Sequence, residues 1–78
     1  MTNIEFLNKL QAEGILKQLI NRGLLPLKVS FHREIYLQVT AQLLINGNNH
    51  GKAVSHVASK LNIEPMTVYR ALKFMKAA

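Results

Sequence analysis

The sequence predicts an all-α fold, a small bundle of four to five short helices. Apolar residues recur at spacings of three and four along nearly the whole chain, which is the period of one helix face. No stretch alternates strictly between apolar and polar residues as a half-buried strand does. Hydrophobic residues make up 49% and charged residues 18% of the 78 positions. This balance and length indicate one globular domain spanning residues 1–78.

The first 23 residues contain two short helical segments. Thr2 or Asn3 is suited to cap the first segment, and Gly23 is a suitable stop after Arg22 at the end of the second. Gly14 marks either a kink or a break between two helices. The apolar positions are Ile4, Leu7 and Leu10 in the first segment, and Ile15, Leu16, Leu19 and Ile20 in the second.

The longest helical pattern follows an apolar connector. Residues 24–29 contain Pro26, which blocks helix continuation, and their leucines and valine predict a connector lying on the core. Ser30 is expected to cap a helix over residues 31–46, which Gly47 ends. Its apolar positions are Phe31, Ile35, Leu37, Val39, Ala41, Leu43, Leu44 and Ile45. Because these cover most sides, we expect a central helix buried on most sides.

Residues 46–49, Asn-Gly-Asn-Asn, form a turn that could also belong to a β-hairpin. The flanking segments favour helices because neither alternates strictly. Downstream, residues 50–78 contain two short amphipathic helices. The first has its apolar face at Val54, Val57, Ala58 and Leu61, and the second at Val68, Ala71, Leu72 and Met75.

Between these two helices lies a break of only three residues. Pro65 suits the first position of the second helix because its missing N–H costs nothing there. Two helices joined so tightly must cross at a large angle, and the small Ala58 is expected at the crossing.

The stretch from Val54 to Lys73 resembles the helix-turn-helix DNA-binding motif. Its central strings, residues 57–63 and 67–70, are most similar to the DNA-binding ends of resolvases and invertases, and similar strings occur in many bacterial regulators. The resemblance covers about a quarter of the chain. Asn62 stands where the motif usually has a turn glycine, and Glu64 where it usually has a Ser or Thr cap. Residues 1–50 resemble no family, and residues 1–49 would be supporting helices.

The resemblance implies sequence-specific binding of double-stranded DNA, with the second helix in the major groove. A small transcriptional regulator or a DNA-binding protein of a phage or mobile element is the expected setting. The implied base-contacting residues are Met66, Tyr69, Arg70 and Lys73. The implied backbone-contacting residues are Lys52, Ser55, His56, Lys60, Thr67 and Lys76.

The charge distribution agrees with this expectation. The chain has a net charge of +6, and residues 50–78 hold five Lys and Arg against Glu64 alone. This excess favours a polyanionic partner. One recognition helix covers few base pairs, so useful specificity suggests a homodimer or a protein partner. The alternative is a helical protein–protein interaction module that uses the helix-turn-helix as a scaffold.

Other functions lack the residues they need. The chain has no Asp, Cys or Trp, and its four glutamates lie far apart in the sequence, so we expect neither an enzyme nor a bound cofactor. His32, His50 and His56 do not have the spacing that places two metal ligands on one helix face. No apolar run reaches 18 residues and no signal peptide pattern is present. We therefore expect a cytoplasmic protein that does not act in a membrane.

Overall fold

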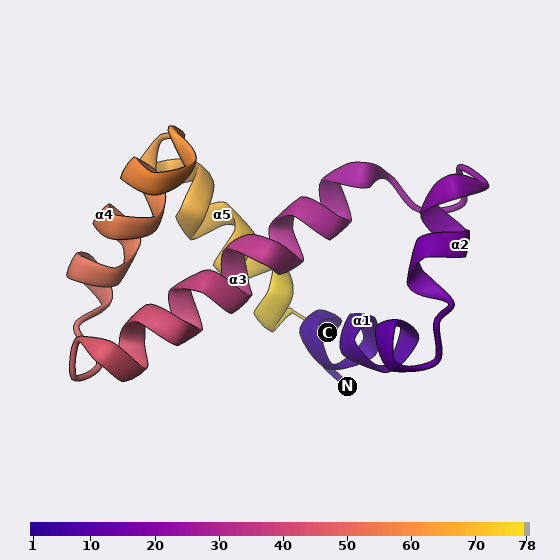
Figure 1. Ribbon diagram of the computed structural model, residues 1–78, viewed down its shortest axis with the longest axis horizontal. Helices are drawn as coiled ribbons and strands as arrows, with labels where there is room; N and C mark the ends of the chain where they lie inside the picture. The colour runs from indigo at the N-terminus through magenta and orange to yellow at the C-terminus, as the bar shows by residue number, and fades with distance from the viewer. Residues whose placement is uncertain (78) are drawn as a thin grey trace.

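The computed structural model describes residues 1–77, and this part of the chain contains five α-helices and no strand. The all-α prediction is confirmed. The helices, shown in Figure 1, are α1 (Asn3–Ala12), α2 (Leu16–Asn21), α3 (Leu27–Ile45), α4 (His50–Leu61) and α5 (Pro65–Lys76).

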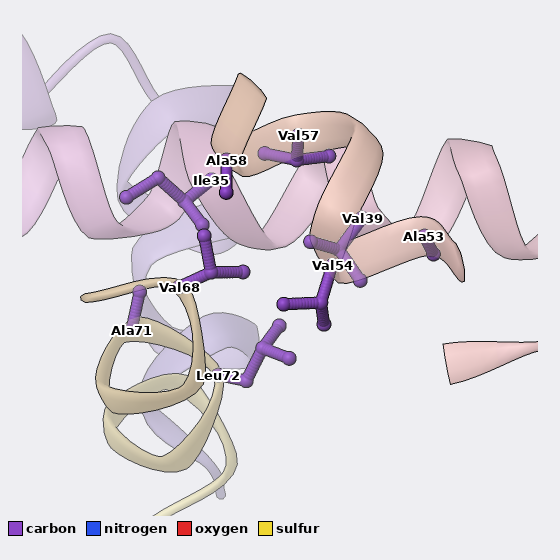
Figure 2. Close-up of a cluster of buried hydrophobic side chains, with 9 residues drawn as sticks. All are labelled: Ile35, Val39, Ala53, Val54, Val57, Ala58, Val68, Ala71 and Leu72. Carbon is purple, nitrogen blue, oxygen red and sulfur yellow. The ribbon is translucent and has the colours of Figure 1, made fainter. Parts of the chain in front are cut away.

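Helix α3 is the centre of the fold, and α4 and α5 pack against one side of it (Figure 1). Their shared apolar core is drawn in Figure 2. Ile35 and Val39 of α3 are fully buried there, and Ile35 points toward Val68 of α5. The remaining members are Ala53, Val54, Val57, Ala58, Ala71 and Leu72. The predicted apolar faces of α4 and α5 are therefore confirmed.

A second apolar cluster joins α1 and α2 to the end of α5. Met75 of α5 is fully buried among residues of these two helices, and the half-buried Tyr36 of α3 packs against both clusters. The α1 and α2 members are Ile4, Leu7, Leu10 and Leu16. Helix α1 thus packs against the C-terminal end of α5, and α2 packs against α1.

The two ends of the chain meet at this place (Figure 1). The backbone N–H of Asn3 donates to the carbonyl oxygen of Ala77 at 2.7 Å, and the Asn3 amide Nδ2 donates to the carbonyl of Phe74 at 2.8 Å. The Phe74 carbonyl also accepts from the Ala77 N–H at 3.3 Å, so the Asn3 amide is its second donor, and the Ala77 carbonyl receives its donor from α1. Asn3 therefore fastens α1 to the end of α5.

The turns between α1, α2 and α3 use left-handed glycines. Gly14 has φ +73° and lies between α1, which ends at Ala12, and α2, which begins at Leu16. It therefore marks a break between two helices and not a kink. Gly23 has φ +72° and follows Arg22, the C-cap of α2, as predicted.

The start of α3 differs from the prediction. The helix begins at Leu27, with Pro26 in extended conformation as its N-cap, so Ser30 lies inside the helix and caps nothing. The reason is that proline is unfavourable inside a helix but well tolerated where one begins. The connector is correspondingly shorter, and it does not lie wholly on the core because Leu24 is 67% exposed. Only Leu25 and Val29 of the expected connector pack against the second cluster.

The burial of α3 was also predicted wrongly in part. The helix is central, but its fully buried residues, Ile35 and Val39, lie only on the side that meets α4 and α5. The apolar residues on its other side are exposed, among them Leu44 and Ile45 at its C-terminal end. Between residues 1 and 77, no helix combines the length and hydropathy needed to cross a membrane.

Candidate nucleic-acid interface

The turn between α4 and α5 consists of Asn62, Ile63 and Glu64. Asn62 has φ +55° and ψ 47°, the left-handed conformation expected of the residue that replaces a turn glycine. The N–H of the next residue, Ile63, donates to the carbonyl of Ala58 at 3.0 Å and closes the end of α4. The half-buried Ile63 side chain packs against the first apolar cluster. The turn is thus held by its backbone and by the core.

Helix α5 begins directly after this turn. Glu64 is extended, and Pro65 occupies the first turn of the helix, as predicted. The Glu64 side chain makes no capping hydrogen bond, so it does not replace the Ser or Thr of the motif as a cap. Its carboxylate is exposed near the N-terminal end of the helix. An acidic group is electrostatically favourable there.

The four expected base-contacting residues all lie on the exposed side of α5. Met66 is 56% and Tyr69 49% exposed, and Arg70 and Lys73 are exposed as well. Their helical spacing places them on one face, opposite the buried Val68, Ala71, Leu72 and Met75. This face presents two large side chains that can make apolar contacts and two cations.

The expected backbone-contacting residues are also accessible. Lys52, Ser55, His56 and Lys60 are exposed on α4, and Lys76 is exposed at the end of α5. Thr67 is half-buried near the start of α5. At the start of α4, the side-chain oxygen of Asn49 accepts a hydrogen bond from the Lys52 N–H at 3.1 Å. Asn49 therefore fixes the first turn of α4, from which Lys52 projects.

One residue of the exposed α4 face was not among the predicted contacts. Ser59 is exposed and lies four positions after Ser55 and three after His56, a spacing that puts all three on one helix face. The helical period that identifies the buried face of α4 also predicts that Ser59 is exposed, because Ser59 is not one of the buried positions. The hydroxyl groups of Ser55 and Ser59 can donate to phosphate oxygens.

A further contact at the edge of α5 was not predicted. The ring of Phe74 meets that of His32 from α3 edge to face, with 5.5 Å between their centroids. Burial, and secondarily the charge of Lys28, lower the pKa of His32 below its ordinary value. His32 is therefore a neutral packing residue at neutral pH. The other two histidines, His50 and His56, are exposed.

The charges around α4 and α5 have one dominant sign. Five basic side chains and one acidic side chain lie within residues 50–78. In the described part of the chain, no group of three or more His, Cys, Asp or Glu side chains is arranged to hold a metal ion. The exposed faces of α4 and α5 are thus positively charged surfaces with hydroxyl and aromatic groups between the cations.

No protein-family model matches this sequence, and neither the curated proteins nor the solved structures contain a match.

Proposed function

We propose that this protein binds double-stranded DNA through α4 and α5, with the exposed face of α5 in the major groove. The observation that supports this best is the composition of that face, where Met66, Tyr69, Arg70 and Lys73 are all accessible. An α-helix fits the width of the major groove. We further propose that the protein acts as a small transcriptional regulator or as a DNA-binding protein of a phage or mobile element.

The side chains of α5 have distinct roles in this proposal. Arg70 donates two hydrogen bonds to the two acceptor atoms on the major-groove edge of guanine. Met66 and Tyr69, with their exposed apolar surfaces, contact thymine methyl groups or sugars. Lys73 lies one turn after Tyr69 on the same face and contacts a base edge in the same groove.

The side chains of α4 position the protein on the DNA backbone. Lys52 and Lys60 lie at opposite ends of its exposed face, with Ser55 and His56 between them. Cations and hydroxyl groups bind phosphate oxygens without regard to sequence. Thr67 and Lys76 extend these contacts along α5.

Fluorescence anisotropy with labelled duplexes, first selected from random sequence, tests the proposal. We expect Arg70→Ala to weaken binding to the selected site by about 1–3 kcal/mol and to relax the preference at one base pair. Lys73→Ala is expected to weaken it as well. Lys17→Ala is the matched control, because Lys17 is an exposed lysine on α2 outside the proposed interface. Unchanged affinity in both α5 variants, with the fold intact, would contradict the proposed placement of α5.

Salt dependence separates DNA binding from a protein interaction module. Lys52, Lys60 and Lys76 are expected to displace counterions from phosphates, so DNA affinity should fall steeply from low to physiological salt. Replacing Lys60 by Ala should reduce the slope of log K against log salt by about 1. If the affinity of the protein for its partner hardly responds to salt, an apolar protein interface on this scaffold is favoured over DNA binding.

A further inference from the structure

The side of α3 that faces away from α4 and α5 is an apolar surface without a partner in the monomer. Leu44 is 83%, Ile45 74% and Leu27 72% exposed, while Phe31 and Leu37 are 42% and 37% exposed. Ala41, also exposed, lies between Leu37 and Leu44. We refer to these six residues as the outer face of α3.

The spacing of the outer face matches a helix-packing surface. Leu27, Glu34 and Ala41 follow one another at seven-residue intervals, as do Leu37 and Leu44. This heptad spacing keeps side chains on one side of a helix over several turns. Small residues let two helix backbones approach closely, and Ala41 supplies one between larger neighbours. Glu34 is the single charged residue that interrupts the stripe.

We propose that the outer face of α3 is the contact surface of a homodimer, in which α3 packs antiparallel against α3 of a second copy. At the exposures given above, its large apolar side chains present roughly 600 Å² per copy, so a pair that covers all of this surface would bury about 1,200 Å², the lower end of stable specific interfaces. Residues 50–78 carry a net charge of +4 out of the total of +6, and they lie outside this face. Two copies can therefore meet here without bringing their main positive charges together.

The position of the charged Glu34 relative to the small Ala41 favours the antiparallel arrangement. A two-fold axis between Leu37 and Gln38 places Glu34 opposite Ala41 of the second copy. A parallel, in-register pair would place the two Glu34 carboxylates against each other, and such like charges are unfavourable.

The antiparallel pairing also places the C-terminal end of the outer face of one copy against a surface hollow of the other copy. It places Leu44 opposite Phe31 of the second copy, and Ile45 opposite Ser30. A surface hollow lined by Leu27, Ser30, Phe31, Arg33 and Glu34 lies in this N-terminal half of α3. The exposed Leu44 and Ile45 of one copy thus meet a hollow on the other whose lining is apolar at Leu27 and Phe31 and polar at Ser30, Arg33 and Glu34.

The mass in solution, measured by sedimentation or light scattering over a range of concentrations without DNA, tests this proposal. The wild type is expected to reach twice the monomer mass as concentration rises. Leu44→Glu is expected to remain a monomer, because it places a charge in the apolar contact. Leu24→Glu is the matched control: Leu24 is a similarly exposed leucine, 67% accessible, that lies outside α3. It should dimerise like the wild type.

A charge pair then tests the orientation. In an antiparallel dimer, Phe31→Lys on one copy faces Leu44→Glu on the other, so the double variant should dimerise again although Leu44→Glu alone does not. Circular dichroism establishes that each variant is folded.

A monomeric wild type at all concentrations, or equal dimerisation of Leu44→Glu and Leu24→Glu, would overturn the proposal and leave the face to another class of partner. A dimeric Leu44→Glu/Phe31→Lys chain is required for the antiparallel arrangement. None of these measurements involves DNA, so their outcome is independent of the proposed DNA binding.

Discussion

At the residue scale, Asn62 and Ala58 determine how α5 is placed against α4. Asn62 supplies the left-handed backbone of the turn, and Ala58, 4% exposed, lies where α3, α4 and α5 share their core. The left-handed conformation of Asn62 and the burial of Ala58 were predicted from the residue type and its place in the pattern, and the place of Ala58 at the crossing of α4 and α5 stays a prediction. The same signals say nothing about which base pairs Arg70 would contact.

Substitutions at Asn62 should follow the cost of a left-handed backbone. Asn62→Gly is expected to leave the free energy of unfolding nearly unchanged, because glycine adopts φ +55° without steric cost. Asn62→Val should lower it by about 1–2 kcal/mol, since a side chain with a branched Cβ is strained there. Urea unfolding followed by circular dichroism measures both. Equal stability of the two variants would show that the turn does not need this conformation.

A larger side chain at Ala58 should destabilise the fold. Ala58→Leu adds volume inside a packed core and is expected to cost about 1–3 kcal/mol. Ser59→Leu is the control, because the neighbouring Ser59 is exposed and the same leucine meets no core there. Thermal unfolding should show a clear drop in Tm for the first variant only. A similar Tm for both would mean that Ala58 tolerates a larger group at the helix junction.

At the element scale, helix ends are determined by capping residues that lie close to them in the sequence. Thr2 caps α1, with its side chain accepting from the Glu5 N–H and the Glu5 carboxylate accepting in return from Thr2. The sequence left Thr2 and Asn3 as alternative caps, and the structure gives Asn3 another role at the end of α5. That role joins positions 71 residues apart, a pairing that no local pattern predicts.

The beginning of α3 shows why a local signal can mislead. Pro26 and Ser30 are both typical helix-start residues, Pro as the residue that a helix follows and Ser as a cap. Only one of them lies at the actual start, and propensity alone does not separate starts four residues apart. The choice of Leu27 extends α3 by one turn and brings Val29 against the second cluster. Tertiary packing therefore decides an ambiguity that the sequence leaves open.

The cap of α1 predicts a pH dependence of stability. Hydrogen bonds from the backbone N–H and the hydroxyl of Thr2 lower the pKa of Glu5 below its ordinary value. Because the folded pKa lies below the unfolded one, Glu5 stabilises the fold above the unfolded pKa, and this contribution disappears as pH falls through the folded pKa. The wild type should therefore have a higher Tm than Glu5→Gln at neutral pH, and the difference should vanish in acid.

A double-mutant comparison assigns this effect to the cap. In a Thr2→Ala background the hydroxyl donor is absent, so the pH-dependent effect of Glu5→Gln on Tm should be smaller there than in the wild-type background. Differential scanning calorimetry of the four chains at acid and neutral pH measures these Tm values. An effect that stays the same in the Thr2→Ala background would assign it to groups other than the cap hydroxyl.

At the scale of the whole molecule, the two apolar clusters depend on α5 in different ways. The N-terminal part of α5 packs on α3 and α4, while Met75 belongs to the cluster formed by α1 and α2. Helical periodicity predicted that Met75 is buried. It could not predict that its neighbours come from the opposite end of the chain, because periodicity describes a face and not its partner.

Truncation of Met75 should loosen the N-terminal helices more than the rest of the fold. Met75→Ala leaves a cavity in the second cluster and is expected to cost about 2–4 kcal/mol. Hydrogen exchange should show lost protection in α1 and α2, while Val39 and Val57, which lie in the first cluster, keep comparatively slow backbone exchange. A uniform loss of protection over all five helices would indicate that the two clusters unfold as one unit.

The outer face of α3 also belongs to this scale. The apolar residues of the helix expected over residues 31–46 predicted burial on most sides, which is wrong for the single chain because Leu37, Leu44 and Ile45 are exposed. Sequence hydrophobicity shows that a surface favours burial but not whether the same chain buries it. The exposure of the candidate DNA-binding residues, except the half-buried Thr67, was predicted correctly, because the positions left after removing the buried face of an amphipathic helix face the solvent.

The hydrogen bond between the Asn3 N–H and the Ala77 carbonyl, 2.7 Å long, has a consequence for the order of the helices along the chain. Joining the present ends through a short glycine-containing linker and reopening the backbone in the exposed turn at Gly47 and Asn48 would give a circular permutant. Such rearrangements are tolerated where the ends are close and the new opening lies in an exposed loop. In the permutant, α4 and α5 are made first and α3 last. The central helix would then be the last segment of the chain to be synthesised. Because the present ends lie close together, the linker can join them without changing how the helices pack.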